Sequence, residues 1–341
     1  MPKKHNTVAV VIPVRNEAEG LDALLGDVFA QEPLPDEVVV ADAGSTDGTA
    51  AILEAWGRRE PRLCRIEAPG AMPGRGRNLA VAAARSEIIV QIDGGCRVSP
   101  GWLASLVRPL LEDRADFVTG KVLPMPIPAA CFGRPYDLSS VLFAGMQWLG
   151  RSERHMAGGA SVAYRRELWE RAGGQPDWLR AGEDVLFAKK VRSLGIRHTY
   201  AEDSVSFWQA GPTLRQALRR KVRYVMASLE IRENLGAVGK IGLRTLAAAF
   251  LIGLSFFRLP ALGVLAAGAA LFWGRNVAKA WRRYALLSEE KNRLPFLPRL
   301  LVLGTASLGW ILAEHVGLFL GLAHILRDGE GRARLKQYKT G

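Results

Sequence analysis

Acidic side chains stand directly after strand-like apolar runs near the start of the chain. The run 87–92 ends in Asp93-Gly94-Gly95, and the run 38–41 ends in Asp42. Ligands of open α/β sheets bind beyond the carboxyl ends of the strands, and glycines there let a ligand approach the backbone. The pattern therefore predicts a ligand site at one sheet edge, with Asp93 at its centre. Asp and Gly are also plain turn formers, so a solvated loop is an equal alternative for any one such turn.

Strand-like and helix-like segments alternate through the first hundred residues. The strand-like runs are short, apolar and rich in β-branched residues, as buried strands of a parallel sheet are. Repeated strand–helix alternation predicts an α/β fold with a doubly wound, mostly parallel sheet whose acidic strand ends share one edge. The strand-like runs are 7–13, 38–41, 63–67 and 87–92, and the helix-like segments are 17–30, 49–58 and 74–85.

Two common nucleotide-binding signatures do not occur in the sequence. There is no G-x-x-x-x-G-K-[S/T] run, which argues against a P-loop nucleotide hydrolase. Gly74 and Gly76 form a G-x-G, but residue 79 is a leucine and the first strand–helix turn carries no glycine fingerprint. A dinucleotide-dependent dehydrogenase is therefore a poor fit.

Several short motifs, in this order along the chain, resemble those of the family 2 glycosyltransferases of GT-A fold. The resemblance covers about residues 7–225. It implies an enzyme with a Rossmann-like catalytic domain that takes a nucleotide-diphosphate sugar as its donor. The motifs are Val11 to Glu17, Asp42 to Thr49, Arg77-Asn78, Gly158 to Arg166 and Gly182 to Val185.

The resemblance also implies which residues bind the donor. Pro13, Glu17 and Asp42 would hold its base and ribose. Two arginines at a helix start, Arg75 and Arg77, would contact its pyrophosphate. For either arginine alone, a solvated cation is an equal alternative. The full implied set is Pro13, Arg15, Glu17, Asp42, Arg75, Arg77, Asp93, Gly94, Gly95, Arg219 and Arg220.

The metal motif of the family is altered in this chain. In the family an Asp-x-Asp motif holds Mg²⁺ or Mn²⁺, which neutralises the leaving diphosphate. Here the motif reads Asp93-Gly94-Gly95, so a glycine replaces the second acid. The resemblance thus implies a divalent cation at Asp93 that binds more weakly than usual, or a partial replacement of its charge by a basic side chain such as Arg97.

Glu183 and Asp184 are the candidate catalytic acids. By resemblance Asp184, with Glu183 beside it, would take the proton of an acceptor hydroxyl during a single displacement that inverts the anomeric centre. An acceptor that is an ionised phosphate needs this base less. Capping of the helix that follows is the alternative role for both acids.

A further family motif, Gln-x-x-Arg-Trp, is incomplete in this chain. It begins at Gln216 and reaches Arg219, but Arg220 stands where the family has Trp. The complete motif marks many polymerising members, so its loss favours transfer of a single sugar. Arg219 and Arg220 would clamp the diphosphate or, at equal odds, form one face of a basic helix.

Charge divides the chain at about residue 214. Residues 1–214 carry 25 basic against 26 acidic side chains, whereas residues 215–341 carry 21 against 7. Basic excess beside long apolar runs predicts contact with anionic membrane lipids. Nucleic acid is not expected as a partner, because no RNA- or DNA-binding motif accompanies the charge.

The second half is predicted to hold the membrane-associated elements. Two apolar stretches within about 245–274 predict a hairpin with its turn near Arg258, and the number of crossings made by 300–326 stays open. Glu314 lies inside that last helix and is either paired with a neighbouring helix or functional, because lone acids in lipid are costly. The predicted domains are 1–212 (GT-A catalytic), 213–240 (basic amphipathic interface helix), 241–326 (membrane-embedded helices) and 327–341 (basic tail).

These expectations combine into one function. Lys3 and Lys4 precede a strand rather than a signal-peptide core, and the three cysteines show no CxxC spacing, as expected in a reducing compartment. We expect a catalytic domain at the cytoplasmic face of the cell inner membrane, moving one sugar to a lipid-linked acceptor (a polyprenyl phosphate or a glycolipid). A non-catalytic nucleotide-sugar-binding partner of a glycan assembly complex is the alternative, and a nucleotidyltransferase ranks last. The sequence predicts neither the sugar, the base nor the oligomeric state.

Overall fold

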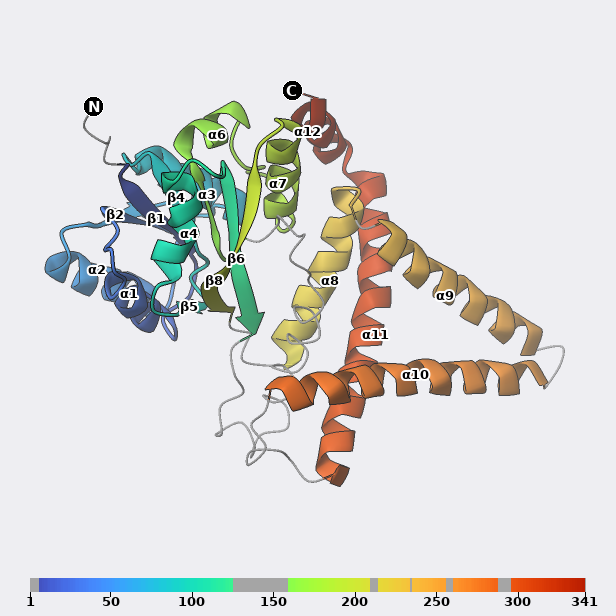
Figure 1. The fold of residues 1–341 in the computed structure, drawn as a ribbon. Coiled ribbons are helices and arrows are strands. Elements are labelled where there is room, and N and C mark those ends of the chain that lie inside the picture. Colours follow the sequence, from blue (N-terminus) through green and yellow to red (C-terminus); the bar gives the residue numbers. More distant parts are fainter. Residues whose placement is uncertain are drawn as a thin grey trace. The chain divides into compact units, whose positions relative to one another are not determined.

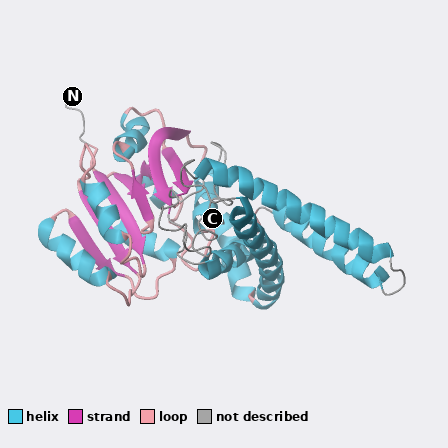
Figure 2. Ribbon diagram, turned by 90° about the horizontal axis from the view of Figure 1, so that it is seen from below, coloured by secondary structure: helices cyan, strands magenta, loops and turns pink. Residues whose placement is uncertain are grey.

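The chain forms two compact units (Figures 1 and 2). One unit comprises residues 1–123 and 151–209, and the other comprises 124–150 and 210–341. We call them the sheet unit and the helical unit. The computed structural model describes residues 6–124, 159–208, 214–233, 235–255, 260–287 and 296–340.

Four parallel strands make up the first half of the sheet, as the alternation of segments predicts. They lie in the order β3-β2-β1-β4, and β1 pairs in parallel with both β2 and β4. Helices flank the strands (Figure 2). The elements are β1 (Val8–Val14), α1 (Leu21–Phe29), β2 (Glu37–Asp42), α2 (Thr49–Arg59), β3 (Leu63–Glu67), α3 (Pro73–Ala83) and β4 (Ile88–Gln91).

The second half of the eight-stranded sheet differs from the predicted parallel pattern. Beyond β4 the order is β7-β6-β8-β5, and the pairs β4–β7, β6–β7 and β5–β8 are antiparallel. The sheet is therefore mixed, with the parallel half carrying the acidic strand ends. The elements are β5 (Cys96–Val98), α4 (Trp102–Leu111), β6 (Phe117–Pro124), β7 (Val162–Arg165), α6 (Arg166–Arg171), α7 (Glu183–Ser193) and β8 (His198–Trp208).

Two boundaries in the sheet unit differ from the sequence expectation. Strand β1 continues through Pro13, where the sequence predicts its end. Proline is tolerated because β4 pairs with β1 only as far as Val11, so one side of β1 is unpaired at Pro13. Helix α1 begins at Leu21 rather than Glu17, since Asn16 has a left-handed φ of 57° and the turn that follows is held by side chains of another loop.

The helical unit consists of five helices among its described residues. Helix α8 ends at Glu230, and Arg232 with φ 56° stops it, so the predicted interface helix does not reach residue 240. Helix α10 extends past the expected end at 274, and the turn expected at Arg258 lies outside the described residues. The helices are α8 (Leu214–Glu230), α9 (Leu235–Ser255), α10 (Pro260–Leu287), α11 (Phe296–Arg327) and α12 (Gly329–Thr340).

Two helices in the described part of the chain have the length and apolar composition needed to cross a membrane. The segments are Leu235–Ile252 of α9 and Ser307–Arg327 of α11. A hydrophobic stretch of about 18 residues or more is the usual requirement for spanning the hydrocarbon core.

Glu314, the acid inside α11, is paired rather than isolated. Its carboxylate lies 3.3 Å from Lys221 Nζ of α8 and 3.0 Å from Arg244 Nη2 of α9. The indole N–H of Trp310 donates to the same carboxylate over 2.8 Å, and Lys221 stacks over the Trp310 ring. The structure thus favours the first of the two roles considered for Glu314, an inter-helical pair that offsets the cost of burying its charge.

Glycines of α11 allow close packing against α8. A Cβ atom added at Gly317 would lie 2.8 Å from Val225 Cβ and 2.9 Å from the carbonyl oxygen of Val222. At Gly321 it would lie 2.7 Å from Leu229 Cδ1. Small residues at such positions are a common means of bringing apolar helices together.

Replacing Gly317 by alanine is expected to destabilise the helical unit. The added methyl group must push α8 away, which costs about 1–3 kcal/mol. Gly239→Ala is the matched control, because nothing lies within 4 Å of a Cβ there and alanine favours a helix by up to about 1 kcal/mol. Thermal unfolding of the full chain in detergent measures both. An equal or higher melting temperature for Gly317→Ala would contradict this packing.

Candidate functional site

The turn after β1 is fastened by the polar loop 42–49. Asn16 N–H donates to Ser45 Oγ over 2.9 Å. Glu17 N–H donates to Thr49 Oγ1 over 2.9 Å, and Ala18 N–H donates to Asp47 Oδ2 over 3.1 Å. The loop 42–49 therefore uses several of its oxygen acceptors to fix the position of Glu17.

Asp42, at the carboxyl end of β2, is almost fully buried with 3% of its surface exposed. Its carboxylate accepts the N–H of Ser45 over 2.9 Å and Arg65 Nη2 over 3.2 Å. The sequence did not single out Arg65, because nothing local links a residue of β3 to this site. Asp42 is thus held rigid with its charge paired.

A buried arginine joins the acidic strand end to helix α7. The Arg77 side chain is 5% exposed; Nη2 lies 2.7 Å from Asp93 Oδ1 and Nη1 lies 2.5 Å from Glu183 Oε1. Burial alone lowers the pKa of Arg77, but the charges of Asp93, Glu183 and Asp184 raise it well above its usual value. Arg77 is therefore a fixed cation between two carboxylates, not a solvated helix-start residue.

Glu183 is buried, and burial raises the pKa of its carboxyl group. Desolvation raises its pKa, the Arg77 charge lowers it, and the neighbouring Asp184 raises it again, with a net upward shift. Only 7% of its side chain is exposed. Glu183 thus serves as the buried partner of Arg77.

The Asp184 side chain has other partners than Glu183, although the two residues are adjacent in the sequence. Its Oδ2 accepts the N–H of Gly159 over 3.2 Å, and its Oδ1 accepts the N–H of Val185 over 2.9 Å. The second bond pairs one of the free N–H groups in the first turn of α7, although the N-cap residue of this helix is Gly182 and not Asp184. A Cβ at Gly159 would overlap Arg77 Nη2, which explains the glycine.

The side-chain amides of Gln175 and Gln91 form a hydrogen-bonded chain that ends at Arg77. Gln175 Oε1 lies 3.4 Å from Arg77 Nη1, and Gln175 Nε2 donates to Gln91 Oε1 over 3.0 Å. Gln91 in turn donates to the buried Tyr164 hydroxyl. The Asn78 side chain bonds the Gln175 backbone twice: its Nδ2 donates to the Gln175 carbonyl, and its Oδ1 accepts the Gln175 N–H. Sequence reasoning missed Gln91 and Gln175. A signal existed for Gln91, which is the polar residue inside the otherwise apolar run 88–92.

Glu17 lies against the two glycines that follow Asp93. A Cβ at Gly94 would lie 2.9 Å from Val14 Cγ1 and 3.1 Å from Glu17 Cγ. At Gly95 a Cβ would lie 3.4 Å from Glu17 Oε2. Gly76 in α3 similarly faces Pro13 at 3.4 Å. The turn after β1 and the loop after β4 therefore meet directly.

The structure brings most of the predicted residues into one region. Arg77 and Gly159 link Asp93, Glu183 and Asp184, and the loop after Asp93 links them to the β1 end. The predicted residues in this connected region are Pro13, Glu17, Arg77, Asp93, Gly94, Gly95, Glu183 and Asp184.

Five arginines considered from the sequence take no part in these contacts. Arg15 and Arg75 are exposed. Arg97, considered as a substitute for the second acid's charge, instead forms an ion pair with Asp27, with 2.7 Å between Nη2 and Oδ1. Arg219 and Arg220 belong to α8 in the helical unit, and their role in donor binding stays a prediction.

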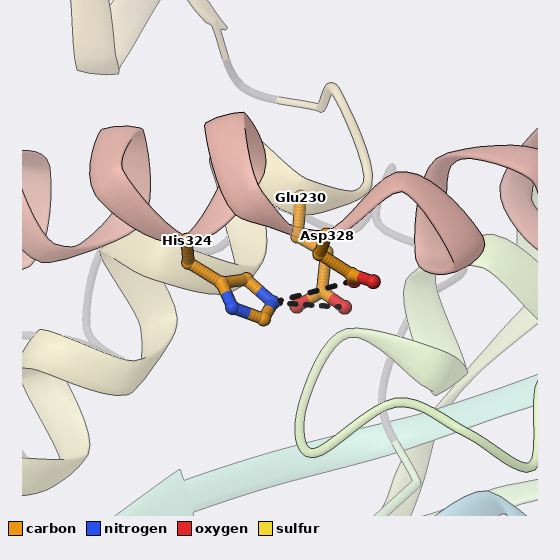
Figure 3. A group of neighbouring side chains, drawn as sticks. All are labelled: Glu230, His324 and Asp328. Atoms are coloured by element: carbon orange, nitrogen blue, oxygen red, sulfur yellow. Dashed lines mark ion pairs between the residues drawn. The ribbon is translucent and has the colours of Figure 1, made fainter.

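A second group of potential cation ligands lies within the helical unit (Figure 3). One ligand atom each from Glu230, His324 and Asp328 lie within 4.8 Å of one another. Two arginines, Arg232 and Arg332, line the same small cavity and oppose a further positive charge there. The group is best described as an ion-pair cluster that joins the ends of α8 and α11 when His324 is protonated.

The family comparison agrees with this geometry. A model described as "Glycosyl transferase family 2" matches residues 9–171, which contain the parallel strands, Arg77 and Asp93. The chain belongs to the family 2 glycosyltransferases. The sequence-based assignment of an enzyme that transfers a sugar is thereby confirmed.

Two relatives of this glycosyltransferase illustrate its similarity. Glycosyltransferase AglE of Haloferax volcanii is 28% identical over 66% of this chain and 73% of its own length. The O-antigen chain rhamnosyltransferase RfbN of Salmonella typhimurium is 25% identical over 82% of this chain and 91% of its own. Relatives of the glycosyltransferase thus include proteins of polysaccharide synthesis.

A solved structure confirms the GT-A fold of this glycosyltransferase. The mannosyltransferase PcManGT of Pyrobaculum calidifontis, in complex with GDP-Man and Mn²⁺, has a TM-score of 0.63 at 24% identity. The match covers 95% of this chain and 88% of that chain. The similarity therefore extends over almost the entire length of both proteins.

Removing the Arg77 guanidinium is expected to be strongly destabilising. Arg77→Ala would leave the buried Glu183 carboxylate without its partner, a change that costs about 3–5 kcal/mol. Arg75→Ala, two residues away on the exposed face of α3, is the control and should unfold like the wild type. Chemical denaturation of the full chain measures both free energies. Equal stability of the two variants would show that the buried pair is not needed.

Proposed function

We propose that this glycosyltransferase moves a single sugar from a nucleotide-diphosphate sugar to a lipid-linked acceptor at the cytoplasmic face of the cell inner membrane. The acceptor would be a polyprenyl phosphate or the hydroxyl of a glycolipid. The observation that carries the proposal is the joint placement of Asp93 and Asp184 through Arg77 and Gly159.

The donor would bind at the carboxyl ends of the parallel strands. This edge is where ligands of open α/β sheets lie. Pro13 is the last residue but one of β1, Asp42 is the last residue of β2, and Glu17 is fixed by Thr49 beside the loop after β4. GDP-Man in the related mannosyltransferase supports a nucleotide-sugar donor for this chain. The ion pair with Arg65 holds the Asp42 carboxylate in place before the donor binds. Asp42 would therefore accept a hydrogen bond from the base without having to move.

The side chains at Asp93 fit a divalent cation. Carboxylate oxygens are the ligands that Mg²⁺ and Mn²⁺ prefer. Asp93 gives only Oδ1 to Arg77, and its side chain is 30% exposed. Mn²⁺ in the related mannosyltransferase supports the same type of ion here. Such an ion, when bound, neutralises charge on the leaving diphosphate.

Asp184 would act as the general base. It is half-buried, and its orientation is set by two backbone N–H groups. It would accept the proton of the acceptor hydroxyl while that oxygen attacks the anomeric carbon, which inverts the stereochemistry. Glu183 does not share this task, because it is buried against Arg77.

The helical unit supports a lipid-linked acceptor. Its two long apolar helices carry large side chains more than half exposed, among them Leu246 (70%) and Phe250 (67%) of α9 and Leu312 (64%) of α11. Exposed apolar surface of this kind suits lipid contact. The basic excess of residues 215–341 favours the cytoplasmic, anionic leaflet.

A donor and acceptor panel with the purified full chain in detergent tests the proposal. Each nucleotide-diphosphate sugar is offered with a polyprenyl phosphate or with a glycolipid, and the product mass gives the number of sugars added. Addition of one sugar, with inverted configuration, is the expected result. The absence of transfer with every pair, or the formation of a long polymer, would refute the proposal.

Asp184→Asn tests the base directly. Transfer to a hydroxyl acceptor should fall about 100-fold or more, since general-base catalysis typically supplies that much. Glu167→Gln, a charge removal in the first turn of α6 on the exposed surface, is the control. Transfer to a phosphate acceptor should fall less, because that acceptor is already ionised. A hydroxyl-directed rate within about tenfold of wild type would exclude Asp184 as the base.

A further inference from the structure

Position 95 is the point at which this chain departs from the metal motif that its resemblance to the family implies. The loop after β4 supplies Asp93 but has glycine where a second carboxylate would stand. Asp93 alone is a poor cation ligand, because Arg77 already neutralises much of its charge at 2.7 Å. A divalent cation at this edge would therefore be held more firmly if another element of the chain added negative charge beside that of the donor diphosphate.

The carboxylate of Glu17 lies beside the vacant position. From the Cβ that residue 95 lacks, Glu17 Oε2 is 3.4 Å away, and Glu17 Oε1 and Cδ are each 4.0 Å away. These are the atoms nearest to that Cβ. A carboxyl group thus lies in contact distance of the first side-chain atom that an acid at position 95 would have, although it comes from the turn after β1.

The backbone of Glu17 is fixed, so this placement does not depend on a mobile loop. Its N–H donates to Thr49 Oγ1, and its carbonyl accepts the N–H groups of Gly20 (3.1 Å) and Leu21 (2.9 Å). Its Cγ lies against Gly94, where a Cβ would be only 3.1 Å from it. Glycine at 94 allows the Glu17 side chain to run along the loop toward position 95.

We propose that Glu17 supplies the second carboxylate of the cation site, so that Asp93 and Glu17 together hold the ion that binds the donor diphosphate. This assignment rests on the proposed function, and it gives Glu17 a cation-binding role in place of contact with the base or ribose. A carboxylate from the turn after β1 would thus stand next to position 95. It follows that an acid at position 95 can replace Glu17.

Reciprocal substitution tests the proposal with a binding measurement. Free Mn²⁺ is followed by electron paramagnetic resonance during titration of the purified full chain, with GDP or UDP present. Glu17→Gln should weaken Mn²⁺ binding by about tenfold or more, because one of two charged ligands is lost. Glu17→Gln combined with Gly95→Asp should restore most of the affinity. Glu19→Gln, an exposed acid in the same turn, is the control and should bind as wild type does.

Three results would overturn the assignment. The first is unchanged Mn²⁺ affinity in Glu17→Gln, even if sugar transfer is lost. The second is a loss of affinity that Gly95→Asp does not restore in a double variant with wild-type melting temperature. The third is unchanged or lower affinity in Gly95→Asp alone, which should bind Mn²⁺ more tightly if a third carboxylate joins the site. This last variant keeps the test valid if Glu17→Gln folds poorly.

Failure of the proposed function would look different. Wild-type protein that binds Mn²⁺ and nucleotide through Glu17 but transfers no sugar to any acceptor would refute the transferase mechanism while leaving the cation site in place. Conversely, normal transfer with Mn²⁺ affinity independent of Glu17 would refute only the cation site.

Discussion

The buried guanidinium of Arg77 is the interaction on which the site depends. A charge that is 5% exposed is stable only with partners at close range, and Asp93 and Glu183 provide them. The pair Arg77–Glu183 spans 106 residues of sequence, and Arg77–Asp93 spans 16. One side chain thereby fixes the end of β4 relative to the start of α7. The proposed base, Asp184, is positioned as a consequence.

The packing around Arg77 explains why small residues surround the site. Gly159 leaves room for the guanidinium, and Gly74 leaves room for the carbonyl of Pro176 in the loop that carries Gln175. Glycine at these positions allows backbone N–H groups to approach the acids directly, as at Gly159 and Asp184. Rigid backbone donors orient a carboxylate better than mobile side chains do. The same close packing makes the site intolerant of added volume.

The helical unit also contains a charged side chain that is mostly buried, but there the central charge is negative. There a single carboxylate, Glu314, lies among apolar helices and is offset by Lys221 and Arg244, with Trp310 covering the charges. Helix α11 approaches α8 closely through Gly317 and Gly321, so the cation and the acid can meet. Both units therefore place a buried ion pair where elements distant in sequence come together. In each case glycine provides the necessary space.

The sequence alone determined the parallel half of the sheet, its acidic edge, the family and the presence of long apolar helices in the second half of the chain. These features are encoded locally, in the period of apolar residues and in short motifs. Tertiary structure decided the partners: Arg77 with Glu183, Asp42 with Arg65, Arg97 with Asp27, and Glu314 with cations of two other helices. It also gave adjacent acids, Glu183 and Asp184, different surroundings. No local pattern specifies such pairs, because burial and charge compensation arise only when distant segments pack.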